Sequence, residues 1–189
     1  MNFTIIISIV STVVWILPPF KQYKSDFFYF FLILAFTDPL TIIGVYLLGI
    51  SPHYVQTALG ILLISSLVYR PKHRYFFVIL SILTFVVFLS FSLQRNITHL
   101  TLIATHFIIV SFLILYFMKY VQEKKAINLF LVFLVTYEFI NVIKLIASSL
   151  SYEHGVISFY LATTTQIFFG IIFMFITIKT KDFPLIIKK

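Results

Sequence analysis

The sequence has no cysteine and very little charge, and each absence excludes whole classes of protein. Without cysteine there can be no disulfide, no thiolate nucleophile and no cysteine-bound metal. Charged residues make up 11% of the 189 residues, against about 25% in an ordinary soluble domain. Hydrophobic residues reach 61%, and this composition cannot supply the polar shell that a soluble domain of this size needs. We therefore exclude a soluble enzyme, a disordered tail and a secreted disulfide scaffold, and infer an integral membrane protein.

Catalytic and nucleotide-binding motifs are also absent. The chain has no glycine-rich phosphate loop, no His-Glu-x-x-His motif and no Gly-x-Ser-x-Gly elbow. Its five glycines form no Gly-x-x-x-Gly motif for close helix crossing. We expect no enzyme activity, no cofactor, no metal and no nucleic-acid partner. Any function must use side chains within the membrane, short loops or partner proteins.

Long apolar runs predict seven transmembrane helices. A membrane helix needs about 20 mainly apolar residues, and these runs do not alternate as β-barrel strands do. The predicted spans are 3–17, 27–50, 52–69, 75–93, 97–116, 127–150 and 156–178. The first run has no basic n-region and no small-residue cleavage site, so we expect a retained helix rather than a signal peptide. The predicted fold class is all-α, a polytopic membrane protein with one seven-helix domain over residues 1–189.

The basic residues gather on one side of the predicted membrane. All but two of the 14 lysines and arginines fall in alternate connections or in the C-terminal tail. Arg95 lies on the opposite side, and Lys144 lies inside the sixth span. The positive-inside rule then places the N-terminus outside and the C-terminus in the cytoplasm. This asymmetry explains the net charge of +8, and the abundance of lysine, phenylalanine and isoleucine indicates an AT-rich genome, so we expect a bacterial inner (cytoplasmic) membrane.

A few polar side chains at membrane depth define the candidate site. A charged Asp or Lys at a helix centre costs at least about 2.5–3.5 kcal/mol on insertion scales. The candidate ligand- or proton-binding residues are Asp38, His106, Glu138, Asn141, Lys144 and Gln166. All except Asn141 and Lys144 lie near the middle of their spans, at about 1.5 Å of rise per residue. These residues could form one buried site, or they could hydrogen-bond between helices to fix packing.

Pro39 directly follows Asp38 and is a candidate hinge. Proline removes a backbone donor and clashes with the preceding turn, so the second span is expected to kink at the acid. The kink could free a carbonyl to line a cavity, or it could serve packing alone.

A shift of 100 residues aligns the first three predicted spans with the last three. The alignment needs no gap and places Asp38 on Glu138 and Gln22 on Gln122. Many transporters contain such repeats. The register predicts a 3+1+3 arrangement, with repeats over 3–70 and 97–178 and a linker helix at 75–93.

The stretch from Leu17 to Ser25 reads Leu-Pro-Pro-Phe-Lys-Gln-Tyr-Lys-Ser. It resembles the first motif of PQ-loop and SWEET-like membrane proteins, with Pro19 in place of their glutamine. The resemblance implies their N-out, seven-span topology with parallel repeats and a transport function. The hydropathy and loop style are also similar to those of small uncharacterised seven-span proteins of Bacteroidota-type bacteria, which can accompany sensor histidine kinases.

Two classes of function remain open. The first is a non-enzymatic sensor or accessory subunit in the lipid bilayer, which acts through a membrane protein partner or as a homo-oligomer. The absence of an output domain and the scarcity of glycine hinges favour it. The second is a small transporter that moves a small solute or protons and uses Asp38 and Glu138. The repeat register and the proline beside Asp38 favour that alternative.

Overall fold

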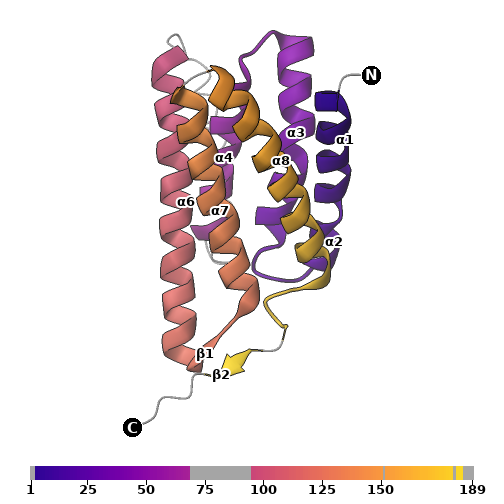
Figure 1. Cartoon of the computed structure of the whole chain (residues 1–189). Helices are drawn as coiled ribbons and strands as arrows, with labels where there is room; N and C mark the ends of the chain where they lie inside the picture. Colours follow the sequence, from indigo (N-terminus) through magenta and orange to yellow (C-terminus); the bar gives the residue numbers. More distant parts are fainter. Residues whose placement is uncertain (1–2, 69–94, 151, 181, 185–189) are drawn as a thin grey trace.

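Apolar helices that run side by side make up most of the structure (Figure 1). The computed structural model describes residues 3–68, 95–150, 152–180 and 182–184. The long helices are α1 (Phe3–Ile16), α3 (Phe28–Leu48), α4 (Pro52–Val68), α6 (Arg95–Lys124), α7 (Leu129–Leu150) and α8 (Tyr152–Phe175). A short helix, α2 (Pro18–Lys21), follows α1. Two short strands, β1 (Ala126–Ile127) and β2 (Phe183–Pro184), pair antiparallel and add a small element to the predicted all-α fold.

Three helices are long and apolar enough to cross a membrane. The qualifying stretches are Phe28–Leu48 in α3, His99–Lys124 in α6 and Leu129–Ala147 in α7. Shorter apolar helical stretches occupy the α1–α2 region, α4 and α8. These are the features of a helical membrane protein. Six of the seven predicted spans coincide with helices, and the predicted span at 75–93 lies outside the described residues.

The largest difference from the predicted bounds is at the end of α6. The predicted span ends at residue 116, whereas the helix continues to Lys124. Lys119 Nζ lies 3.8 Å from Glu123 Oε1 one turn further on, and both side chains are exposed. Such pairs support a helix beyond its apolar run. The helix stops where Lys125 adopts a positive φ of 51°, so most of the predicted connection at 119–126 is helical.

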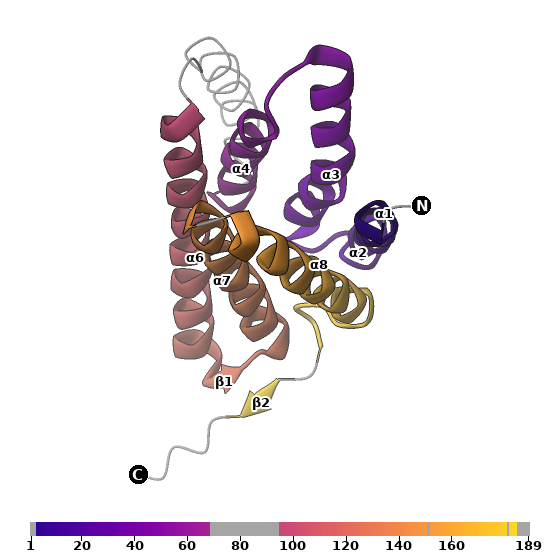
Figure 2. The same ribbon diagram turned by 45° about the horizontal axis from the view of Figure 1, so that its top comes forward.

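The six long helices form a closed ring. Each contacts the next in the order α1, α3, α4, α6, α7 and α8, and α8 contacts α1 again. Figure 2, in which the top of the molecule is tilted forward, helps to follow this order. Large apolar side chains cover the outside of the ring, among them the exposed Tyr46, Leu47 and Leu161. An apolar outer surface of this extent is expected of helices that face lipid.

Gly60 and Gly170 mark two of the three close glycine contacts between neighbouring helices of the described residues; the third is Gly44 of α3 against Val55 of α4. A Cβ atom at Gly60 of α4 would lie 2.7 Å from Thr105 Cγ2 of α6. A Cβ atom at Gly170 of α8 would lie 2.6 Å from Val14 Cγ1 of α1. Small residues therefore set these two helix contacts although no Gly-x-x-x-Gly motif is present.

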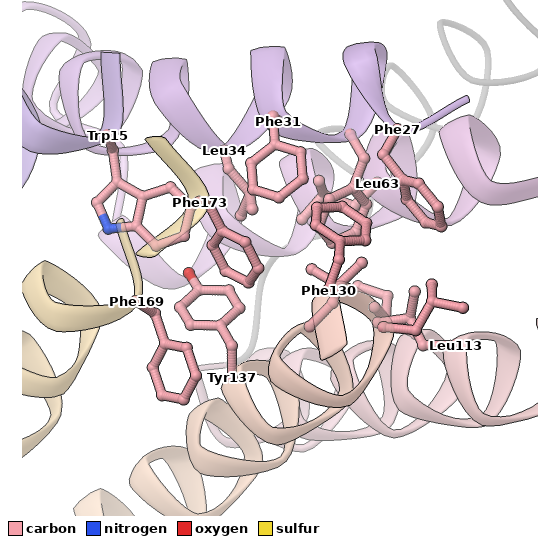
Figure 3. Close-up of a cluster of buried hydrophobic side chains, with 14 residues drawn as sticks. Trp15, Phe27, Phe31, Leu34, Leu63, Leu113, Phe130, Tyr137, Phe169 and Phe173 are labelled. Atoms are coloured by element: carbon pink, nitrogen blue, oxygen red, sulfur yellow. The ribbon is translucent and has the colours of Figure 1, made fainter. Parts of the chain in front are cut away.

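An aromatic cluster fills the ring near the end that carries α2 and β1 (Figure 3). It consists of Trp15, Phe27, Phe30, Phe31, Leu34, Leu63, Ile109, Leu113, Phe130, Leu131, Leu134, Tyr137, Phe169 and Phe173. Phe173 is fully buried, and its ring centroid lies 5.0 Å from that of Phe31 and 6.2 Å from that of Trp15. Aromatic pairs at these distances add about 0.5–1.5 kcal/mol each beyond the burial of area. The cluster joins all six long helices at this end.

Two buried amides tie the end of α8 to the rest of the ring. Gln22 Nε2 donates to the carbonyls of Phe173 (3.3 Å) and Ile176 (2.8 Å), which lie where helical carbonyls lose their own donors. Asn128 Oδ1 accepts from the Leu131 amide at the start of α7 (3.3 Å). Asn128 Nδ2 donates to the carbonyl of Ile178 (2.9 Å). These bonds fix the position of α8 relative to α2 and α7.

Candidate functional site

A polar cavity of about 130 Å³ lies inside the ring, next to the aromatic cluster. All six long helices contribute to its lining. Its charged, amide, imidazole and aliphatic hydroxyl side chains are Ser11, Thr37, Asp38, Gln56, His106, Asn141, Lys144 and Gln166. Trp15, Leu34, Leu63 and Tyr137 belong to both the cavity wall and the aromatic cluster. The cavity is therefore polar on one side and closed by packed aromatic and aliphatic groups on the other.

Asp38 reaches the cavity from the middle of α3. The helix continues through Pro39, which has no N–H to give to the carbonyl of Ala35 one turn earlier. The hydroxyl of Thr37 donates to the carbonyl of Ile33 at 2.9 Å and so turns back onto its own helix. Within the described part of the chain, the Asp38 carboxylate has no hydrogen bond to a protein group. This carboxylate is thus available to a molecule in the cavity.

His106 and Glu138 form a buried pair between α6 and α7. His106 Nδ1 lies 3.0 Å from Glu138 Oε2. The Glu138 side chain is 0% exposed, and its other oxygen, Oε1, has no hydrogen-bond partner among the described residues. His106 lines the cavity, whereas Glu138 does not. The imidazole therefore lies between the cavity and a buried carboxylate, an arrangement that can pass a proton from one to the other.

Asn141, Lys144 and Gln166 complete the polar lining from α7 and α8. Gln166 Nε2 donates to Asn141 Oδ1 at 3.1 Å, which joins these two helices. The Lys144 ammonium and the Asp38 carboxylate attract each other electrostatically. The cavity thus presents one group of each charge, from α7 and α3, together with neutral amides.

The structure brings five of the six predicted site residues to the cavity lining. Glu138 is the sixth, and it reaches the cavity only through His106. Pro39, the predicted hinge, does not end α3, and it lines a separate apolar groove on the outside of the ring. His99 lies two helical turns before His106 on α6. Its Nε2 atom is hydrogen-bonded to the carbonyl of Leu145 at 3.2 Å.

The sequence did not identify several polar residues that line the cavity or hold the helices around it. Ser11, Thr37 and Gln56 line the cavity, but short hydroxyls and single amides are common in apolar helices. Gln22 and Asn128 are fully buried and hold the end of α8. Asn128 had a usable signature, because an asparagine immediately before an apolar run favours a helix N-cap. Nothing in the sequence around Gln22 indicates that its partners are carbonyls of α8.

The donor set of the cavity favours an organic ligand or protons over a metal. Among the described residues, no group of three or more His, Asp and Glu side chains could hold a metal ion. Carboxylate, ammonium, imidazole and amide groups instead offer hydrogen bonds to a small polar molecule.

Comparisons of the chain with protein-family models, with curated proteins and with solved structures found no match.

Proposed function

We propose that the protein is a small membrane transporter that holds a small polar solute, or protons, in the cavity at the centre of its helix ring. The observation that carries the proposal is the convergence of all six long helices on one cavity with a carboxylate, an ammonium and an imidazole in its wall. Charged groups at membrane depth are costly and usually mark solute or proton pathways.

The two charges of the cavity indicate the kind of solute. Asp38 would face a cationic group and Lys144 an anionic group, so a small zwitterion satisfies both. A cavity of about 130 Å³ is close to the ~150 Å³ that holds a benzene-sized molecule. Glycine and alanine are therefore the appropriate first probes, and proton movement through His106 and Glu138 is measured beside them.

We place the protein across a bacterial inner membrane with seven spans, the N-terminus outside and the C-terminus in the cytoplasm. The positions of basic residues support this orientation. Lys21 ends α2, Lys124 ends α6 and Lys179 follows α8, and these three element ends lie at the same end of the ring (Figure 1). The positive-inside rule assigns that end to the cytoplasm.

The 3+1+3 repeat is part of the same proposal. In the ring, α1, α3 and α4 are consecutive and are followed by α6, α7 and α8 in the same sense. This order is what two parallel repeats would produce. Asp38 and Glu138 would then be equivalent positions with different roles, since the first lines the cavity and the second lies behind His106.

Reconstituted vesicles test the transport proposal. Wild-type protein is expected to take up labelled glycine or alanine, or to move protons reported by an enclosed pH-sensitive dye. Asp38→Asn should abolish this flux while the free energy of unfolding changes by less than about 1 kcal/mol. Asp26→Asn is the matched control, because Asp26 is an exposed acid outside the cavity. Equal flux in wild type and Asp38→Asn would overturn the proposal.

A sensor or accessory subunit is the second candidate. The aromatic cluster favours it, because a cavity sealed at one end by packed rings suits a ligand that is bound and not passed on. Binding of labelled glycine or alanine in detergent, lost in Asp38→Asn but unaccompanied by flux in vesicles, would favour this candidate over transport.

A further inference from the structure

An apolar groove of about 500 Å³ lies on the outside of the ring, against α1, α2 and α3. Its wall includes Ile16, Phe20, Leu32, Phe36 and Pro39. Phe20 and Phe36 are 76% and 52% exposed, so the groove opens to the surroundings of the helices and not to the polar cavity. Its volume falls within the range of about 300–1,000 Å³ that is usual for ligand pockets.

Two lysines directly follow residues that line this groove: Lys21 follows Phe20, and Lys24 follows Tyr23. Lys21 is the last residue of α2 and is exposed. Lys24 Nζ lies 5.6 Å from the ring centroid of Tyr23, and Tyr23 itself lines the groove. Lys24 has a positive φ of 65°, a conformation that a lysine rarely adopts. The nearest acid along the chain, Asp26, accepts a hydrogen bond from the Tyr116 hydroxyl of α6 at 3.5 Å and is not among the residues that line the groove.

We propose that this groove binds an acyl chain of an anionic phospholipid whose phosphate lies at Lys21 and Lys24. The apolar wall matches a hydrocarbon chain, and the two lysines match a negatively charged headgroup. Basic residues beside membrane helices recognise anionic lipids in this way. The groove wall runs from Phe20 and Tyr23, which directly precede the two lysines, to Pro39 inside α3.

Because of the position of Pro39, a lipid bound in the groove would also affect the cavity. Pro39 faces the groove, and its neighbour Asp38 faces the cavity on the inside of the ring. An acyl chain packed against Pro39 supports the turn of α3 in which the proline leaves one backbone carbonyl without its helical hydrogen bond. The bound lipid would therefore hold Asp38 in place, although the lipid site itself does not depend on transport.

Native mass spectrometry of the full chain in detergent tests the proposal. Phosphatidylglycerol and phosphatidylcholine with identical acyl chains are added in equal amounts, and the lipid-bound fractions are compared. The wild type should retain phosphatidylglycerol preferentially. The double variant Lys21→Gln, Lys24→Gln should weaken this retention by roughly 25-fold, since each lysine near a membrane surface contributes about fivefold. The control Lys124→Gln, Lys125→Gln removes the same charge at the same end of the ring and should retain the lipid.

A second variant separates the acyl-chain contact from the charge. Phe20→Ala combined with Phe36→Ala removes two exposed groove walls and should weaken retention of both lipids while the preference for phosphatidylglycerol persists. This double phenylalanine variant also tests the proposal if the variant with Lys21→Gln and Lys24→Gln does not fold. Equal retention of the two lipids by the wild type, equal loss in both lysine pairs, or unchanged retention in the phenylalanine variant would each overturn the proposal.

Discussion

Along each helix of the ring, residues near the end that carries α2 and β1 pack into the aromatic cluster, and residues further along line the polar cavity. In α7, Phe130 and Leu134 belong to the cluster, Asn141 and Lys144 belong to the cavity, and Tyr137 belongs to both. The same helices thus combine two chemically different interiors. Trp15, Leu34, Leu63 and Tyr137 form the boundary between them, because they belong to both.

The aromatic cluster and the polar cavity region differ in how completely their buried side chains are packed or hydrogen-bonded. The cluster is apolar, and its rings pack against one another at centroid distances of 4.8–6.3 Å for Trp15 and its three neighbours. In the polar region, Glu138 Oε1 has no hydrogen-bond partner among the described residues. A buried polar group without a partner costs about 1–3 kcal/mol. Packing in the cluster therefore stabilises the ring, whereas we expect the polar cavity to contribute less to its stability.

Phe173→Ala should give the largest loss of stability. The side chain is fully buried and contacts Trp15, Phe31 and Tyr137, so its removal leaves a large void. We expect the free energy of unfolding in mixed micelles to fall by about 3–5 kcal/mol. Phe175→Ala is the control, because Phe175 is 71% exposed two residues further on. Similar losses in the two variants would contradict a stabilising role for the cluster.

The His106–Glu138 pair should show a smaller, coupled effect. A double-mutant cycle with His106→Ala and Glu138→Ala is expected to give a coupling energy of about 2 kcal/mol, because the two groups lie 3.0 Å apart in a buried site. The same cycle on the exposed pair Lys119 and Glu123 should give about 0.3–0.5 kcal/mol. Additive effects at His106 and Glu138 would mean that the pair is not formed in the folded protein.

The helices were predictable because an apolar run of membrane length leaves few other structures for the backbone. The predicted bounds for α3 and α4 lie within two residues of the observed ones. The end of α6 was not predictable from hydropathy, since its last turns are held by a charged pair and not by apolar residues.

For the candidate site, the sequence predicts the depth of each residue along its helix but not the direction in which its side chain points. Counting residues places Asp38, His106 and Gln166 at similar depths. Whether a side chain faces the cavity depends on how each helix is rotated in the ring. Glu138 illustrates this limit, because it shares the depth of Asp38 and yet lies behind His106 instead of in the lining.

Gln166→Leu should give the smallest effect on stability and sharpen the contrast with the cluster. The change removes the hydrogen bond from Gln166 Nε2 to Asn141 Oδ1, and such bonds between membrane helices average about 0.6 kcal/mol. Thr165→Val is the matched control, since its hydroxyl donates to the Leu161 carbonyl of its own helix, and it should change the free energy of unfolding even less. Because Gln166 lines the cavity and Thr165 does not, only Gln166→Leu should alter uptake or binding of labelled glycine and alanine. A loss of several kcal/mol in Gln166→Leu with unchanged solute binding would instead assign the polar residues to packing, as part of one stabilising core with the aromatic cluster.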